Sequence, residues 1–274
     1  MEFKYVDNHA HLNLAAYDAD RDMAIERAKD ADVLVINVGT QKDTSKKAVE
    51  IAEETDNCFA IVGLHPVHTS KSFHDEQEIG EGGKEFTSRG EIFDYEYYKK
   101  LCENPKVVGI GECGLDKYRS EEWVGEVKEK QIDAFKKQIE LSLEVKKPLM
   151  LHIREAYKEA LEILKMYPGV KGNAHFFAGT IEEAKEFLDL GFTISFTGVI
   201  TFAKQYEELV KFVPLNMMLS ETDCPYVTPA PFRGKRNESL YVIEVIKKIA
   251  EIKQLPFDEV ATQLRENSKK LWGI

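Results

Sequence analysis

The sequence predicts an α/β protein folded as a (β/α)8 TIM barrel, in which eight parallel strands form a ring covered by helices. Short β-rich runs alternate with helical segments through the 274 residues. The runs are nearly continuous apolar stretches, such as Val-Leu-Val-Ile-Asn-Val at residues 33–38, as parallel strands buried on both faces should be. Eight strand and helix repeats in about 250 residues are typical of this barrel. A doubly wound open sheet is the main alternative.

Each predicted strand is short, and helical periodicity resumes soon after most of them. The strands cover residues 4–9, 33–38, 58–64, 107–111, 148–152, 172–175, 193–196 and 217–220. Helical spacing of apolar residues and capping residues predict helices at 18–31, 43–55, 95–103, 121–145, 156–166, 180–190, 203–212, 237–253 and 256–271. The length suits one large domain or two small ones, and the eight repeats favour a single barrel over residues 1–274.

One long segment, residues 68–94, interrupts the alternation. It contains Glu-Gly-Glu-Gly-Gly and many polar residues, and it shows no convincing period. It follows the third strand, at the end of a barrel that carries the active site, where long loops often act as lids or binding elements. The other interpretation is a disordered or species-specific insertion. His68 and His74 within it are left unassigned.

Composition excludes several classes of protein. The 37 basic and 48 acidic residues give a formal charge of -11, which argues against general electrostatic binding to nucleic acid but allows a local basic site. No apolar run approaches the ~18 residues of a membrane helix, and the N-terminus does not resemble a signal segment. We therefore expect a cytoplasmic protein. The four cysteines form no Cys-x-x-Cys pair, so neither a zinc ribbon nor a disulfide framework is indicated.

Potential metal ligands lie at the ends of five of the predicted strands. His9 and His11 are two residues apart in a strand, so both imidazoles point the same way and can hold one ion. The other candidates follow strands 4, 5, 6 and 8, and they are Glu112, His152, His175 and Asp223. Only a closed ring brings these strand ends together, so the barrel and the site support each other. Imidazole and carboxylate suit zinc, manganese or magnesium.

Each candidate has an ordinary alternative when it is considered alone. A buried histidine is more often a hydrogen-bonded core residue than a ligand, and Glu112 or Asp223 could cap a helix. Six such residues at strand ends favour a metal site, because buried charge is costly without such a purpose.

Five motifs follow one another in a specific order. They are Asp7-Asn8-His9-Ala10-His11-Leu12, Gly63-Leu64-His65-Pro66, Gly109-Ile110-Gly111-Glu112-Cys113-Gly114-Leu115-Asp116, Leu151-His152-Ile153-Arg154 and Glu221-Thr222-Asp223-Cys224-Pro225-Tyr226. Together they resemble the TatD family of metal-dependent deoxyribonucleases, and the resemblance runs from about residue 5 to residue 272. The segment Pro231-Phe232-Arg233-Gly234-Lys235-Arg236-Asn237-Glu238 is also close to one in that family.

The resemblance implies two divalent ions per chain, Mg, Mn or Zn. It places His9, His11 and Asp223 on one ion, His152 and His175 on the second, and Glu112 between the two. Ions ~3.5 to 4 Å apart need an anionic bridge, which a glutamate can supply; related amidohydrolases use a carboxylated lysine at this position. Asp223 could act as a ligand, as the acceptor of a proton from the attacking water, or as both.

Substrate contacts are expected around this site. His65 could contact a substrate phosphate, or it could form a hydrogen bond that ends the strand before Pro66. Arg154 projects on the same side as His152. Other basic residues predicted at this rim are Lys117, Arg119, Arg233, Lys235 and Arg236. Guanidinium groups bind phosphate in a bidentate way. Alternatively, Arg233 and Arg236 tie the last loop to the barrel through Glu221 or Glu238.

Aromatic residues on the rim could stack on the bases of a single strand. They are Tyr118, Phe176, Phe177, Tyr226 and Phe232, and core packing explains at least half of them.

These observations favour a divalent-metal-dependent phosphodiesterase that hydrolyses DNA, an exodeoxyribonuclease acting on single-stranded or frayed ends. Asp223 and Glu112 are the expected catalytic residues, and His65, Arg154 and Arg233 the expected substrate contacts. One alternative is a hydrolase of the same fold acting on a C–N or ester bond, such as a lactone. A metal-binding scaffold without turnover is another. The protein is expected to be a monomer or weak oligomer without a membrane partner.

Overall fold

The computed structural model describes residues 3–71, 73–74, 86–87, 89–117 and 123–274. Its main feature is an eight-stranded sheet in the order β1-β2-β3-β6-β7-β8-β9-β10, and every neighbouring pair is parallel. The strands are β1 (Tyr5–Ala10), β2 (Val33–Val38), β3 (Cys58–Val62), β6 (Val107–Asp116), β7 (Leu149–Arg154), β8 (Gly172–Ala174), β9 (Thr193–Phe196) and β10 (Met218–Ser220). All eight predicted strands are present.

Backbone contacts bring the two outer strands of this sheet together. His11 N donates to Cys224 O at 2.8 Å, and Asp223 N donates to His9 O at 2.9 Å. Ala10 and Cys224 form a parallel bridge. The sheet is therefore the nearly closed barrel that the sequence predicts, and the open sheet is wrong.

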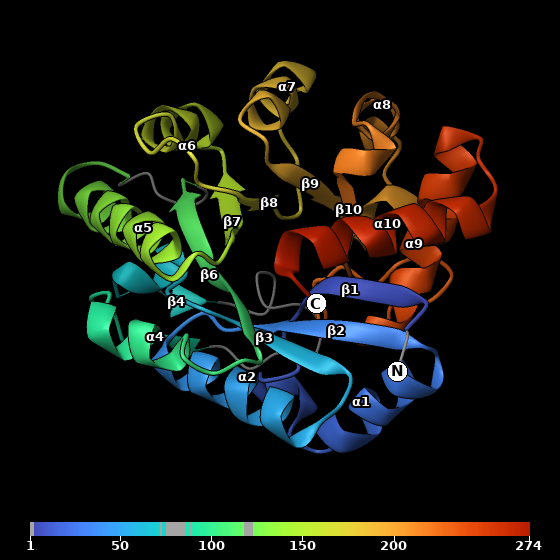
Figure 1. Cartoon of the computed structure of the whole chain (residues 1–274), viewed down its shortest axis with the longest axis horizontal. Coiled ribbons are helices and arrows are strands. Elements are labelled where there is room, and N and C mark those ends of the chain that lie inside the picture. Colours follow the sequence, from blue (N-terminus) through green and yellow to red (C-terminus); the bar gives the residue numbers. More distant parts are fainter. Residues whose placement is uncertain (1–2, 72, 75–85, 88, 118–122) are drawn as a thin grey trace.

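Helices surround the barrel on the outside (Figure 1). They are α1 (Arg21–Asp30), α2 (Lys42–Glu54), α4 (Tyr95–Leu101), α5 (Gly125–Val145), α6 (Tyr157–Leu164), α7 (Ile181–Asp189), α8 (Glu207–Phe212), α9 (Val242–Lys253) and α10 (Phe257–Trp272). Short 3-10 turns lie at η1 (Ala15–Tyr17), η2 (Pro66–Thr69), η3 (Gly198–Thr201), η4 (Lys204–Tyr206), η5 (Leu215–Met217) and η6 (Ser239–Tyr241). Among the described residues, no helix is long and apolar enough to cross a membrane.

Two predicted helices begin with a 3-10 turn. The helix predicted at 203–212 is divided into η4 and α8. The one predicted at 237–253 starts as η6, because Asn237 belongs to the preceding loop, where its side-chain nitrogen donates to Thr222 O at 3.0 Å. Propensity does not detect such a tertiary contact.

The fourth predicted strand is longer in the structure than the sequence indicates. It was expected to end at Gly111, whereas β6 continues to Asp116 and pairs with β7 as far as Arg154. Gly114 has a φ of +143°, and a Cβ added there would clash with the carbonyl oxygen of His152. Glycine is therefore required for the close approach of the two strands.

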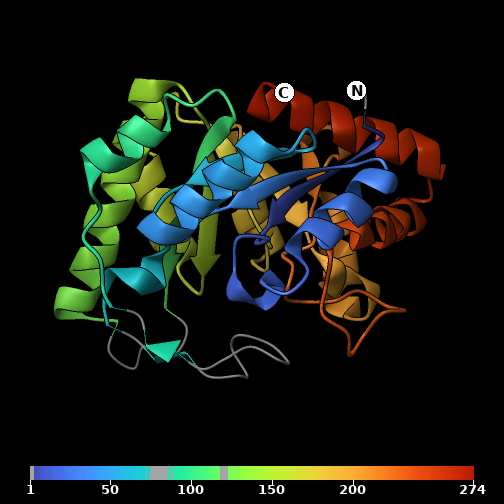
Figure 2. The ribbon, with the colours of Figure 1, turned by 90° about the horizontal axis from the view of Figure 1, so that it is seen from below.

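The segment 68–94 contains two short strands that were not predicted. β4 (Phe73–His74) and β5 (Phe86–Thr87) pair antiparallel. Figure 2 shows β4 on the same side of the molecule as the loop that follows β10, which is the end toward which β6 points. The lid and insertion hypotheses both stay predictions, because residues 72, 75–85 and 88 lie outside the described part.

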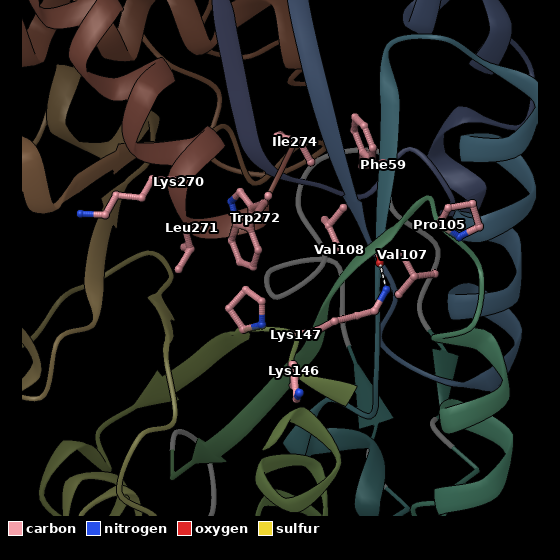
Figure 3. A pocket seen from close by; sticks show the side chains of 12 residues that line it. Phe59, Pro105, Val107, Val108, Lys146, Lys147, Lys270, Leu271, Trp272 and Ile274 are labelled. Atoms are coloured by element: carbon pink, nitrogen blue, oxygen red, sulfur yellow. Dashed lines mark hydrogen bonds between the residues drawn. The ribbon is translucent and has the colours of Figure 1, made fainter. Parts of the chain in front are cut away.

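The opposite end of the barrel is filled by an apolar cluster. Its members are Val6, Ile36, Val38, Ile61, Val108, Met150, Leu219 and Trp272. Trp272 comes from α10, and its Nε1 donates to Asn8 Oδ1 at 2.9 Å. A pocket of about 310 Å³ lies beside it, where the Lys147 ammonium donates to Val107 O (Figure 3).

Candidate metal centre

The structure brings the six predicted ligands together at the C-terminal end of the barrel. His9 lies in β1, Glu112 in β6 and His152 in β7. His11 and His175 directly follow β1 and β8, and Asp223 lies three residues after the end of β10. Five of the six residues are buried, and His152 is partly exposed. Parallel strands end on one rim of a barrel, which is why residues far apart in the sequence meet there.

Three ligand atoms, from His9, His11 and Glu112, lie within coordination distance of one another, and an oxygen of Asp223 lies close to the two imidazoles. His9 Nε2 lies 3.0 Å from His11 Nε2. Glu112 Oε2 lies 3.4 and 3.6 Å from these two nitrogen atoms, and Asp223 Oδ1 lies 3.8 and 3.5 Å from them. Metal–ligand bonds of about 2.1 Å in a tetrahedron give ligand separations of about 3.4 Å. The donor set and its spacing therefore fit a divalent metal.

The other oxygen of Glu112 faces a second group of imidazoles. Glu112 Oε1 lies 2.9 Å from His152 Nδ1, 3.3 Å from His175 Nε2 and 3.5 Å from His65 Nε2. The two oxygens of one carboxylate thus face two different sets of histidines, as a bridging ligand requires. His65, predicted as a substrate contact, also lies within ligand range of Glu112 and His152.

Two buried carboxylates that the sequence analysis did not assign to the site hold the histidines in place. His152 Nε2 donates to Asp116 Oδ2 at 2.8 Å, and His175 Nδ1 donates to Glu221 Oε1 at 3.0 Å. Glu221 also accepts from Phe176 N at 2.7 Å and from Ser195 Oγ at 2.6 Å. Such partners fix the orientation of a ligand histidine. Both carboxylates lie within ligand motifs, which was the signal available in the sequence.

Charges in the site favour an ionised bridge. Burial raises the pKa of Glu112, but the positive potential of His65, His9 and His175 outweighs burial and holds this pKa well below its usual range. Burial lowers the pKa of His152, whereas hydrogen bonds with Asp116 and Glu112 raise it, and the result is about 9. The Glu112 carboxylate is therefore ionised even before metal binds, and its charge can offset that of cations.

Asp223 has an unusual backbone conformation that aims its carboxylate at the site. Its φ is +57°, a left-handed value that aspartate tolerates better than most residues. The preceding residue, Thr222, is held by Asp7, whose carboxylate accepts from its backbone N at 2.8 Å and from its Oγ1 at 2.7 Å. Burial raises the pKa of Asp7 to about 7. β1 and the residue that follows it thus supply His9, His11 and the anchor of the Asp223 loop.

A family model described as TatD related DNase matches residues 6–273. The chain belongs to the TatD family. It is 40% identical over 273 residues to an uncharacterized metal-dependent hydrolase, YabD of Bacillus subtilis, with 98% of both chains covered. It is 31% identical to the 3'-5' ssDNA/RNA exonuclease TatD of Erwinia amylovora, covering 98% of this chain and 99% of the relative.

Solved structures agree with this assignment. The crystal structure of YjjV, a TatD homologue from Escherichia coli, superposes with a TM-score of 0.83 at 25% identity, and both chains are fully covered. The predicted family and the predicted barrel are therefore confirmed. This TatD-family protein is a metal-dependent hydrolase.

The arginines of this TatD-family protein have different environments. Arg236 donates to both carboxylate oxygens of Asp20, at 2.6 and 2.7 Å, and to Glu238 at 3.3 Å. It therefore ties the last loop to the barrel chiefly through Asp20, an anchor that the alternative interpretation did not name. Glu221, the other proposed anchor, instead binds His175. Arg233 is exposed, and its Nη1 donates to Thr228 O at 2.8 Å.

The remaining predicted basic contacts also differ in exposure and in their partners. Arg154 is the last residue of β7 and is exposed beyond His152. Lys117 forms an ion pair with Glu159 at 2.6 Å. Arg119 lies outside the described residues, as does Tyr118. Arg154 and Arg233 thus stay predicted substrate contacts.

Among the predicted aromatic contacts, Phe176 and Tyr226 are partly exposed beside the metal ligands. Their ring centroids lie 6.0 Å from His175 and 6.3 Å from His11, respectively. Phe177 is buried against Tyr157 at 4.9 Å and belongs to the core. Phe232 stacks on Tyr241 at 4.2 Å.

Proposed function

We propose that this TatD-family protein is a divalent-metal-dependent phosphodiesterase that hydrolyses DNA from an end, through a water activated between two metal ions. The observation that carries the proposal is the placement of Glu112. Its Oε2 faces His9 and His11, and its Oε1 faces His152 and His175. In this assignment His9, His11 and Asp223 would hold one ion, His152 and His175 would hold the second, and Glu112 would supply an oxygen to each.

Bound divalent ions would lower the pKa of a water molecule toward ~7 and neutralise the phosphate oxygens on which charge develops. The protein's own residues then position the substrate and move one proton. Asp223 is the candidate acceptor of that proton, because 12% of its side chain is exposed at the entrance, compared with 4% for Glu112. Glu112 is more deeply buried, and its proposed role is that of a negatively charged bridging ligand.

The choice of DNA rests on the substrate side of the site. Arg154 and Arg233 are exposed at the rim of a chain with a net charge of -11, and guanidinium matches phosphate geometry. The Erwinia amylovora relative is named as a 3'-5' ssDNA/RNA exonuclease. Single-stranded or frayed DNA ends are therefore the proposed substrate, and RNA is the alternative to compare with them.

A hydrolysis screen tests this proposal. The substrates are single-stranded DNA, duplex DNA, RNA and a panel of lactones, each with Mg²⁺, Mn²⁺ or Zn²⁺ and with a chelator. We expect mononucleotides from single-stranded DNA, with no release in chelator and none from Glu112→Ala. Glu126→Ala, a change of an exposed carboxylate on α5, is the matched control and should behave as wild type. Turnover of lactones alone would falsify the phosphodiesterase.

A further inference from the structure

We propose that Phe202 and Arg233 form a rim platform that binds a base and a neighbouring phosphate of single-stranded nucleic acid, away from the bond that is cleaved. This inference rests on the proposed function and adds a specific binding site to it. Phe202 follows η3, in the loop after β9, and Arg233 lies in the loop after β10. Both loops belong to the end of the barrel that holds the metal ligands.

The rim platform is already assembled in the free protein. The guanidinium carbon of Arg233 lies 4.1 Å from the centre of the Phe202 ring. Nη1 of the same arginine donates to Thr228 O at 2.8 Å. Two contacts of different kinds thus fix the guanidinium, although Arg233 is exposed and Phe202 is 44% exposed. Binding to a fixed side chain avoids the entropy cost of ordering it.

The two loops that carry the platform are joined to each other. Ala230 N donates to Thr201 Oγ1 at 2.8 Å. Gly198 contacts the other loop so closely that an added Cβ would clash with Val227 O. The positions of Phe202 and Arg233 are therefore fixed relative to each other by the backbone as well as by their own contact.

The platform lies within reach of a strand whose end is in the metal centre. Thr228, which holds Arg233, is five residues after Asp223. A fully extended chain spans at most ~3.6 Å per residue, so the two Cα atoms are within about 18 Å of each other. Tyr226, between them, has its ring 6.3 Å from that of His11. A short single strand can bridge this distance.

Charge favours a polyanionic ligand at the platform. Lys204 and Lys235 lie two residues from Phe202 and Arg233, respectively. In the part of the chain that the structure describes, none of Lys204, Arg233 and Lys235 forms an ion pair, in contrast to the nearby Arg236. Arg233 contacts the exposed ring, and the two lysines belong to the loops that carry it, so three cations without carboxylate partners lie in this part of an acidic protein. Aromatic rings and guanidinium planes both stack on bases without strong sequence preference.

Binding of a short phosphorothioate oligothymidylate, which resists hydrolysis, tests the platform. Fluorescence anisotropy is measured with Mg²⁺ for wild type, Phe202→Ala, Phe202→Tyr and Phe212→Ala. We expect Phe202→Ala to weaken binding about 5- to 100-fold, the range of a single base–aromatic stack. Phe202→Tyr, which keeps the ring, should restore it. Phe212, 38% exposed at the end of α8 toward the opposite end of the barrel, is the matched control and should bind as wild type.

An abasic scan separates stacking from a merely structural role. Each base in turn is replaced by a tetrahydrofuran abasic residue. Removal of the base at one position should weaken binding to wild type. The same removal should not further weaken binding to Phe202→Ala, because that variant has already lost the contact with this base. Equal losses in both proteins at every position would overturn the platform, as would unchanged affinity of Phe202→Ala.

Failure of the platform can be told apart from failure of the proposed function. If wild type hydrolyses DNA and the Phe202 variants bind it equally well, the platform alone is wrong. If wild type neither binds nor hydrolyses any nucleic acid but turns over bis(4-nitrophenyl) phosphate, the proposed substrate is wrong, and the platform is overturned with it.

Discussion

The two ends of the barrel are built from the same strands but have opposite chemistry. In β7, Met150 belongs to the apolar cluster beside Trp272, His152 lies in the metal centre, and Arg154 is exposed at the rim. These residues alternate along one strand and therefore share one face. One end fills the barrel with hydrocarbon, and the other crowds imidazoles and carboxylates around Glu112. The difference shows that a single alternation supplies stability at one end and ligands at the other.

The crowded end is costly without metal. His9 Nε2 and His11 Nε2 approach to 3.0 Å, and the carboxylates around them are removed from water. Buried charges are tolerated when they are paired or coordinate a metal. The apolar end must therefore provide much of the stability that allows the other end to keep its ligands together.

The largest effect on stability is expected at the apolar end. Trp272→Ala removes a side chain that is 4% exposed and leaves Asn8 Oδ1 without its donor. The free energy of unfolding should fall by about 3 to 5 kcal/mol, as for other buried large aromatic residues. Urea unfolding measures it. The folded fraction should still bind metal as wild type does, and a loss of metal without a loss of stability would contradict the division between the ends.

Metal should stabilise the protein through the other end alone. At a free metal concentration 100 times the Kd, each bound ion should add about 2.7 kcal/mol to the free energy of unfolding, seen as a higher Tm than in chelator. The same gain is expected in Trp272→Ala, because the two ends do not share residues. A Tm that does not respond to Mn²⁺ or Zn²⁺ would count against a metal site.

A smaller effect is expected from a partner of one ligand. Glu221→Gln keeps the shape of the side chain and an oxygen that can accept from His175 Nδ1 and Phe176 N, but it removes the negative charge that strengthens both hydrogen bonds. Loss of such a partner typically lowers metal affinity about 10- to 100-fold. Calorimetric titration of metal measures it. Glu183→Gln, at the start of α7, is the control at which affinity should not change.

The smallest effect is expected at an exposed network in the loops around the metal end. Arg236 and Arg27 hold the pKa of Asp20 at about 2, chiefly through the Arg236 hydrogen bonds. A depressed pKa gives stability above the unfolded value of 3.8 that is lost as pH falls toward 2. Arg236→Ala should therefore cost less than about 1 kcal/mol at neutral pH and flatten the acid dependence. An unchanged acid profile in thermal melts would show that the pair does not contribute.

Sequence reasoning reached the site because its ligands follow from two local rules. Alternation places His9 beside His11, and the ends of parallel strands meet on one rim. Neither rule identifies partners that only folding brings together. Asp20 lies 216 residues from Arg236, and Glu221 binds the end of β8 from the loop after β10. The extension of β6 to Asp116 was missed for a related reason. Glycine has a low strand propensity, and only the folded structure shows that Gly114 packs closely against β7.

The central claim is that Glu112 bridges two metal ions, and the number of ions bound per chain tests it most directly. Wild type and Glu112→Ala are loaded with Mn²⁺ or Zn²⁺, freed of excess ion, and analysed for metal by mass spectrometry against protein concentration. We predict two ions per wild-type chain and no more than one in Glu112→Ala, with both proteins folded by circular dichroism. A single ion in wild type, or two ions in both proteins, would contradict the bridge.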